Sequence, residues 1–167
     1  MQTASLRAMT TQAMAGLTSE QIVALTSAQA AALTSGQAAA LSTDQIAVME
    51  TADLSALAAT SVAAMGTALI EALTTAQISA ITSSQLAVLT TAQIQAIQTE
   101  DIEAMTTAQI SRLSMAQVAA LTSGQVQALE TGDLRTLSAV QLRALDTAQV
   151  QQLTSEQVAA LTSAQVA

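Results

Sequence analysis

The chain has 167 residues, no His, Cys, Pro, Lys or aromatic residue, and a net charge of −8 from 12 acidic and 4 basic side chains. This composition lacks the thiolate and imidazole groups of zinc sites and of most nucleophilic enzymes. Four arginines without aromatic residues cannot supply the phosphate contacts and base stacking that nucleic acids require. We therefore expect no catalytic residues, no cofactor, no metal and no nucleic acid partner.

The mean hydropathy of +0.46 is high for a chain outside membranes. However, Thr, Ser and Gln interrupt every apolar stretch, so the roughly 20 apolar residues of a spanning helix are never reached. The first octapeptide, MQTASLRA, lacks the charged and apolar regions of a signal peptide. We expect no membrane insertion.

The sequence is an octapeptide repeat from its first residue to its last, with twenty full copies and a partial copy that lacks its final residue. Typical copies are LTSEQIVA (17–24), LTTAQISA (73–80) and LTSEQVAA (153–160). Position 1 is Leu, Met or Ile in all 21 copies, position 3 is Ser or Thr in 18, and position 5 is Gln in 14. Position 6 is apolar in every copy, and position 8 is commonly Ala. We expect residues 1–167 to form one repeat domain.

Each octapeptide contains a complete helix-start signal. In 17–24, Thr18 followed by Gln21 predicts a capping box, in which each side chain satisfies the other residue's backbone N–H. Leu17 and Ile22 occupy the two positions of a hydrophobic staple. The sequence therefore predicts an all-α fold with one helix of about six residues in each octapeptide.

One continuous helix is excluded, because an octapeptide turns through about 800° and the apolar stripe would circle the rod within about five repeats. A coiled coil needs a period near 3.5 residues or an 11-residue repeat, and strands disfavour Ala, Gln, Leu and Met. Since one short helix cannot be stable alone, successive coils must stack as a solenoid. Positions 6 and 1, such as Ile22 and Leu25, share a helix face and are expected to point to its axis.

The number of helices in each coil is indicated by residues 2, 50, 98 and 146. All four replace the usual Thr with Gln, Glu, Gln and Asp, and each lies six octapeptides after the previous one. Six octapeptides make a whole number of three-helix coils but not of four-helix coils. We expect three helices per coil, with four as the alternative.

The LTTAQI phrasing resembles the octapeptide-repeat arrays of large, repetitive bacterial proteins. The resemblance covers the whole chain. It implies a triangular, Toblerone-like helical solenoid, and a place within a larger secreted or cell-surface bacterial protein. It implies no activity and no functional residue.

Some copies depart from the pattern. Where position 2 is Glu50, Gly66, Gln98 or Glu130, the Thr that follows it is expected to cap the helix instead. In 57–72 Gln is absent from position 5, so the geometry is expected to be least regular there.

The densest charge lies at Glu100, Asp101 and Glu103, which could be considered calcium ligands. The glycine and alternating ligands of a calcium loop are missing, so we expect these acids to favour the helix N-terminus instead. The Ser and Thr of position 3 could form hydroxyl ladders matching ice, but capping explains them more simply. Only Met115 among the methionines is expected to face outward.

These patterns predict a structural array acting as a rigid spacer or stalk. The alternative is an interaction module that binds a protein, a glycan or ice through the variable positions 4 and 7. Arg112, Arg135 and Arg143 could mark a partner-binding edge, although solvated side chains over the coil below are the simpler interpretation. Carboxylate-based hydrolysis would require two acids facing each other across a cleft.

The chain stops within a repeat and has no polar terminal cap. Solenoids normally need such a cap at each end. We therefore expect either an excised fragment of a larger protein or end-to-end self-association through the uncapped ends.

Overall fold

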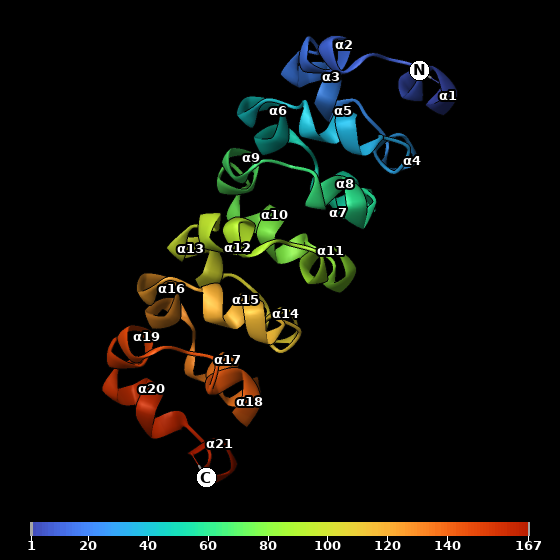
Figure 1. Ribbon diagram of the computed structural model, residues 1–167. Coiled ribbons are helices and arrows are strands. Elements are labelled where there is room, and N and C mark those ends of the chain that lie inside the picture. The colour runs from blue at the N-terminus through green and yellow to red at the C-terminus, as the bar shows by residue number, and fades with distance from the viewer. Residues whose placement is uncertain (1, 167) are drawn as a thin grey trace. The chain divides into compact units, whose positions relative to one another are not determined.

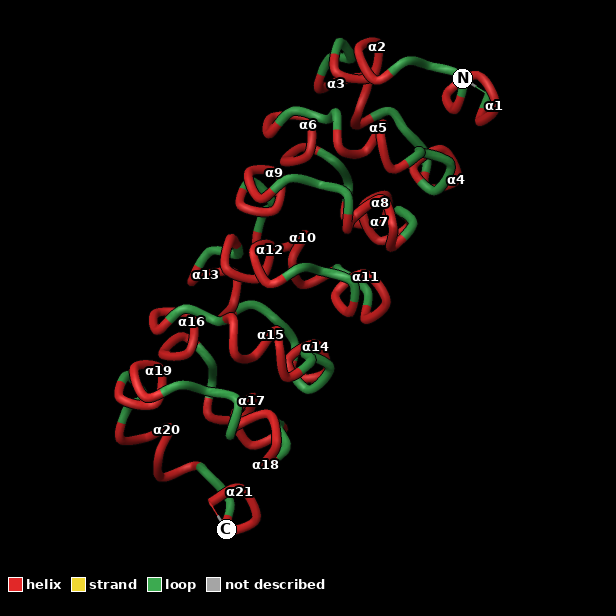
Figure 2. The backbone as a smooth tube through the Cα atoms, viewed as in Figure 1, coloured by secondary structure: helices red, strands yellow, loops and turns green. Residues whose placement is uncertain are grey.

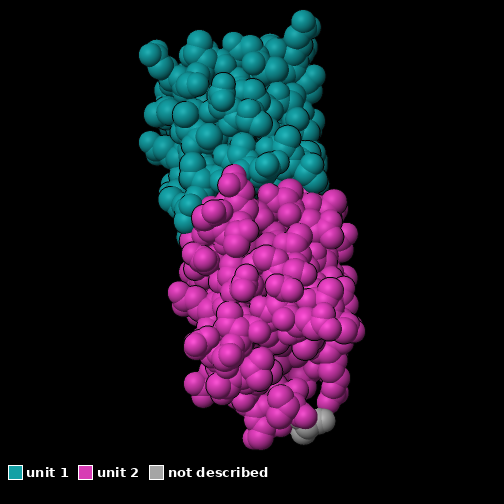
Figure 3. Space-filling model, turned by 90° about the vertical axis from the view of Figure 1, so that its left-hand side faces the viewer, with its two compact units in different colours: residues 1–89 teal, residues 90–167 magenta. Residues whose placement is uncertain are grey.

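The computed structural model describes residues 2–166, in which it has 21 short helices and no strand. The all-α prediction is confirmed. The chain forms two compact units, Met1–Leu89 and Thr90–Ala167, shown in different colours in Figure 3. The expectation of one repeat domain stays a prediction.

Unit 1 contains eleven helices within its described residues. They are α1 (Thr3–Arg7), α2 (Thr11–Ala15), α3 (Ser19–Val23), α4 (Ser27–Ala30), α5 (Ser35–Ala39), α6 (Thr43–Val48), α7 (Thr51–Ala56), α8 (Ala59–Ala63), α9 (Thr67–Glu71), α10 (Thr75–Ala80) and α11 (Ser83–Ala87).

Unit 2 contains ten helices within its described residues. They are α12 (Thr91–Ala96), α13 (Thr99–Glu103), α14 (Thr107–Ile110), α15 (Met115–Ala120), α16 (Ser123–Ala128), α17 (Thr131–Thr136), α18 (Ala139–Leu142), α19 (Thr147–Gln151), α20 (Ser155–Ala160) and α21 (Ser163–Val166). Figure 2 shows the short loops that separate successive helices in both units.

Within each unit, a helix packs against the helix three places further along the chain. In unit 1, α4 contacts α7, α5 contacts α8 and α7 contacts α10; in unit 2, α12 contacts α15 and α13 contacts α16 (Figure 1). Three octapeptides therefore make one coil. The prediction of three helices per coil is confirmed, and the four-helix alternative is wrong.

The core of each coil is built from positions 1 and 6. Ile46 and Ile94, both at position 6, are almost fully buried, and so are Leu33 and Leu41 at position 1. Removing such a side chain from water contributes about 1.5–3 kcal/mol, which is how helices this short become stable together. The axis-facing role predicted for these positions is therefore observed at these residues and at Ile22, whereas Leu25 is only half-buried.

The helices begin as their repeats predict. Position 2 of the octapeptide is the N-cap, with extended backbone angles, and both hydrogen bonds of the capping box form at many helices. In unit 1 the complete capping boxes begin at Thr18, Thr26, Thr34, Ser42, Thr74 and Thr82, and the Thr10 side chain accepts one bond, from the Ala13 N–H. In unit 2 they are Thr90, Thr106, Ser114, Thr122, Ser138, Asp146 and Thr154.

One expectation about the caps is wrong. Glu50, Gly66, Gln98 and Glu130 remain the N-cap residues although their side chains make no capping hydrogen bond, and the following Thr is already the first helical residue. The apolar positions fix the phase of the repeat, so the helix start does not move by one residue to use a better side chain. Position 3 therefore does not supply the caps.

The break in the pattern at 57–72 does not interrupt the helices. Both α8 and α9 form without a capping side chain at Ala58 or Gly66. Val62 and Ile70 remain buried at position 6. The apolar residues are therefore sufficient to specify a coil when the polar residues are missing.

Candidate functional site

The side-chain amide of Gln at position 5 forms hydrogen bonds through both its oxygen and its nitrogen. In unit 1, Gln77 Oε1 accepts from the Thr74 N–H at 2.8 Å, which closes the capping box of α10. Its Nε2 donates to the carbonyl oxygens of Ile46 and Met49, both at 2.7 Å. The Gln amide therefore joins the start of one helix to the chain at the end of a helix in the preceding coil.

The same pair of donated bonds recurs at fixed sequence separations in both units. Gln85 Nε2 donates to Leu54 O and Leu57 O, and in unit 2 Gln125 Nε2 donates to Ile94 O and Ile97 O. Equivalent bonds are made by Gln37, Gln45, Gln157 and Gln165. The acceptors are carbonyls at helix ends, where the regular helical bond from four residues later is lost. The position-6 carbonyls also accept a backbone N–H from three residues later, as Ile46 O does from Met49 N at 3.2 Å.

This second role is missed by sequence reasoning, although the sequence holds a signal for it. A capping box accepts Glu as readily as Gln, because only an acceptor oxygen is needed. Position 5 nevertheless contains Gln in 14 copies and Glu in none. Only an amide can both accept from the cap and donate to the coil below.

Asp replaces Gln at three copies and changes this network. In unit 1, Asp53 is 2% exposed, and its Oδ1 accepts from the Ser27 hydroxyl at 2.8 Å. Its Oδ2 is buried without a hydrogen-bond partner. Asp has no amide N–H to donate to the carbonyl oxygens, and Asp53 instead accepts from a position-3 hydroxyl of the preceding coil.

Asp133 occupies the equivalent place in unit 2 and is also almost fully buried. Burial raises the pKa of the Asp133 carboxyl above its ordinary value of 3.8, and the negative charge of Glu130 adds to the rise. Hydrogen bonds from the Thr107 side chain and with the Glu130 backbone oppose it. The position-3 hydroxyl of the preceding coil again hydrogen-bonds the buried carboxyl. The Ser and Thr of position 3 therefore stabilise the interior where Asp53 and Asp133 replace Gln.

The acids at Glu100, Asp101 and Glu103 do not converge. Asp101 is buried inside unit 2, whereas Glu100 and Glu103 are exposed. Within residues 2–166, no group of three or more acidic side chains is placed to hold a metal ion. The described helices also include none that is long and apolar enough to cross a membrane.

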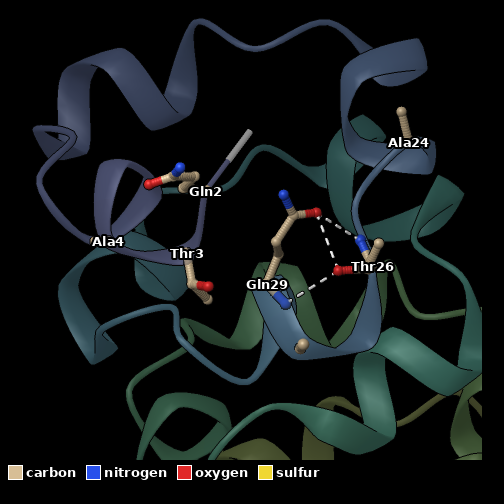
Figure 4. A pocket seen from close by; sticks show the side chains of 7 residues that line it. Gln2, Thr3, Ala4, Ala24, Thr26 and Gln29 are labelled. Carbon is tan, nitrogen blue, oxygen red and sulfur yellow. Dashed lines mark hydrogen bonds between the residues drawn. The ribbon is translucent and has the colours of Figure 1, made fainter.

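Two open cavities are lined by polar side chains. In unit 1, a cavity of about 550 Å³ lies beside α1 and α4, where Gln29 points into it next to Thr26 (Figure 4). In unit 2, a cavity of about 410 Å³ is lined by Glu103, Glu130 and Gln157 among others. Carboxylate-based hydrolysis would need two acids facing each other across a cleft, and the second cavity has Glu103 and Glu130 in its lining. Its open position does not exclude water from the two carboxylates.

The variable positions 4 and 7 are not evenly distributed. In unit 1 their acids lie only on α3, α6 and α9, as Glu20, Asp44 and Glu71. In unit 2, position 7 supplies Arg135 near the end of α17 and Arg143 immediately after α18. Met115 is exposed as expected, and Val140 at position 4 is equally exposed, which sequence reasoning missed.

Stacked short helices joined by repeated hydrogen bonds define each unit as a helical solenoid built from octapeptides. The ALTTAQ repeat matches the chain over residues 1–35, 46–83, 70–99, 94–131 and 126–163. The chain therefore belongs to the ALTTAQ-repeat family, and the predicted octapeptide-repeat resemblance is confirmed. A comparison with curated proteins finds no match.

Proposed function

We propose that this repeat protein is a structural array, used as a rigid spacer, stalk or scaffold, with no catalytic activity. The observation that supports this most directly is the Gln network, in which Gln77 and Gln125 each join two coils through several hydrogen bonds. The recurrent residue types at positions 1, 2, 5 and 6 all take part in capping or stacking. The Ser and Thr of position 3 also recur, and Ser27 and Thr107 bind buried carboxyls of the next coil. A hydroxyl nucleophile needs a base beside it, and no basic residue type recurs in the repeat.

A spacer requires that each added coil extends the array by the same amount. Helices packed side by side lie about 8–10 Å apart, so each coil of three octapeptides should add roughly that length. Deleting residues 25–48 removes one coil of unit 1 and joins Ala24 to Met49 in the correct phase of the repeat. Small-angle scattering should show a maximum dimension shorter by about 8–10 Å with unchanged helicity per residue.

The matched control is deletion of residues 25–36, which removes a shorter segment but destroys the octapeptide phase. It should lower the helicity of unit 1. If both deletions reduce helicity equally, or if the coil deletion leaves the maximum dimension unchanged, the spacer proposal is wrong.

A second candidate function is an interaction module. Val23 and Val48 in unit 1, and Met115 and Val140 in unit 2, are exposed and favour it, because exposed apolar side chains within one surface mark binding sites. A protein partner fits these residues better than ice or a glycan does. Thermal hysteresis and glycan-array binding test the two other ligands directly, and a positive result in either would replace the protein partner.

End-to-end self-association remains part of the proposal for partners. Val150, Val158 and Val166 occupy position 6 and are exposed, whereas Val118 and Val126 at the same position are fully buried. A further coil, from the same array or from a second copy, would cover the exposed valines. Replacing Val158 and Val166 with Asp should abolish such stacking, as measured by sedimentation of the whole chain, and association unaffected by these changes would contradict it.

A further inference from the structure

Exposed apolar side chains in unit 1 coincide with its acidic residues. Val23 on α3 is 44% exposed and Val48 on α6 is 38% exposed. The same stacked helices carry Glu20 and Asp44, both exposed, and α9 adds Glu71. We call α3, α6 and α9 the acidic side of unit 1. It has three acids and no basic residue.

Unit 2 has a side of opposite character. Met115 on α15 is 54% exposed and Val140 on α18 is 55% exposed. Arg143 directly follows α18, whereas Arg112 follows α14 and Arg135 lies within α17, and both are exposed. We call α12, α15, α18 and α21, together with these arginines, the basic side. Its four helices contain no acidic residue, and α17, which carries Arg135, contains the buried Asp133 and begins after Glu130.

Met115 and Val140 lie on stacked helices, and their separation in the sequence is one that brings side chains together in this fold. In unit 1, a Cβ added to Gly36 would lie 3.6 Å from Thr11 Cγ2, and in unit 2 a Cβ added to Gly124 would lie 4.0 Å from Thr99 Oγ1. Both of these pairs join position 4 to position 3 of the preceding coil, as Val140 and Met115 do, whereas a Cβ added to Gly132, also at position 4, would have no neighbour within 4 Å. Because α15 packs on α18 and the Met115 side chain is long, we treat Met115 and Val140 as one apolar patch.

Folding does not explain this patch. Position 3 is Ser or Thr in 18 of the 21 copies, and Met115 is the only large apolar residue in that column. Val140 is likewise the only Val at position 4. Neither side chain is buried, so neither stabilises a coil by removing its surface from water.

We propose that the acidic side of one copy of this chain docks on the basic side of a second copy. The two sides are opposite in charge, and each carries exposed apolar residues that the other would cover. Complementary charge around an apolar centre is the arrangement that gives specific association. The acids of α13 are a poorer match, because Glu100 and Glu103 have no exposed large apolar side chain beside them among the described residues of that helix.

The proposal is tested by sedimentation of the whole chain carrying Val158→Asp and Val166→Asp, so that end-to-end stacking makes no contribution. This chain should self-associate at low salt and dissociate as the salt rises to about 0.5 M, because exposed charge pairs are screened. Arg112→Glu with Arg135→Glu should weaken the association by roughly tenfold or more. Glu71 and Arg143 are left unchanged, because each already has an interaction within the structure.

Charge reversal on the other side provides the decisive comparison. Glu20→Arg with Asp44→Arg should also weaken self-association by roughly tenfold or more, and mixing this variant with the Arg112→Glu, Arg135→Glu variant should restore a complex. The matched control is Glu100→Arg with Glu103→Arg, which changes two exposed acids of α13 and should leave the association unchanged. Met115→Thr should weaken the complex severalfold without changing its salt dependence.

Three results would overturn the proposal. The first is a monomeric chain at low salt, the second is equal loss of association in the α13 control, and the third is failure of the mixed variants to form a complex. Circular dichroism of each variant checks that its helices remain intact. We expect no change, because all the substituted side chains are exposed.

Discussion

Two successive coils of unit 1 differ in almost every polar residue and yet form the same structure. In the coil α4–α6, Thr26, Thr34 and Ser42 each cap a helix through a complete capping box. In the coil α7–α9, the N-cap side chains of Glu50, Ala58 and Gly66 make no capping bond. Position 5 changes as well, from Gln in all three helices to Asp, Ser and Leu.

What the two coils share is the apolar pattern. Ile46 in the first coil and Leu54 in the second are equally buried, and α4 packs on α7 as α5 packs on α8. Positions 1 and 6 therefore specify the coil, whereas capping boxes and Gln bonds add stability to a structure already chosen. Substitutions test this division of roles, and their expected effects range from a large loss of stability to a small change in its pH dependence.

The residues that the coils share should matter most. Ile46→Ala and Leu54→Ala should each lower the free energy of unfolding by about 2–5 kcal/mol, because each removes a fully buried side chain and leaves a cavity. Urea unfolding followed by far-UV circular dichroism measures both. If only Ile46→Ala, in the coil with complete capping boxes, lowered the free energy of unfolding, then positions 1 and 6 would not specify both coils.

Gln45→Glu should lower the free energy of unfolding by about 3 kcal/mol, because a charged acceptor left unsatisfied in a buried site is costly. The new carboxylate keeps the capping acceptor for Ser42 but faces the carbonyls of Met14 and Leu17, to which Gln45 Nε2 now donates. Gln21→Glu is the matched control, since Gln21 has the same capping box and is exposed. Equal losses in both variants, by urea unfolding, would mean that the donated bonds contribute nothing.

Asp53→Gln should raise the free energy of unfolding by about 1–2 kcal/mol, because it removes an unpartnered buried oxygen. The sequence separations of the bonds made by Gln77 place Ile22 O and Leu25 O where the new amide can donate. Asp53→Asn is the control, because its shorter side chain should not span to both carbonyls. Hydrogen exchange of unit 1 amides gives the measurement, and a gain that is the same for Asn would indicate that only the charge matters.

Ala58→Thr should stabilise α8 by about 1 kcal/mol, since it supplies a capping hydroxyl to a helix that has none. Thr34→Ala in the other coil should cost about the same amount, because Thr34 accepts from the Gln37 N–H. Chemical denaturation of the two variants measures whether the free energy of unfolding rises with Ala58→Thr and falls with Thr34→Ala. A loss on introducing Thr at residue 58 would contradict the interpretation of the second coil.

The weakest effect concerns the pH dependence of unit 2. Because the pKa of Asp133 is raised in the folded chain, the folded state binds this proton more tightly than the unfolded state does. The contribution of Asp133 to the free energy of unfolding is therefore most favourable below its ordinary pKa of 3.8, and it decreases as the pH rises through the raised value.

Asp133→Asn should remove the contribution of Asp133 to the pH dependence of the free energy of unfolding, while keeping an acceptor oxygen for the Thr107 hydroxyl. Urea unfolding measured across the acidic range compares the two chains. An unchanged slope would show that Asp133 does not titrate differently in the two states.

Most of the fold could be predicted from the sequence, because the apolar columns and the capping pair are local signals. Thr18 and Gln21 show their relation within one octapeptide, and the interval of six octapeptides between Glu50 and Gln98 indicates three helices per coil. The bonds from Gln77 to Ile46 and Met49 could not be predicted in the same way, since they depend on how far one coil rises above the next.

The candidate surfaces were predicted less well. The exposure of Met115 could be predicted from its place at position 3 of the repeat. Val140 becomes part of a candidate surface only because α18 packs on α15, which the sequence does not show. The expected caps at Thr51 and Thr67 were wrong because the phase of buried residues overrides the preference of a single side chain. Sequence reasoning therefore succeeds where partners are neighbours in the chain and fails where they are a coil apart.

The Gln bonds described above between coils run in one direction. Each donated bond goes from a later residue to a carbonyl of the preceding coil, as from Gln45 to Leu17 in unit 1 or from Gln157 to Leu129 in unit 2. During synthesis on the ribosome, a new helix of either unit therefore emerges beside a finished template that already presents its acceptors. Such a chain can fold in the order in which it is made, with no segment waiting for one that has yet to be translated.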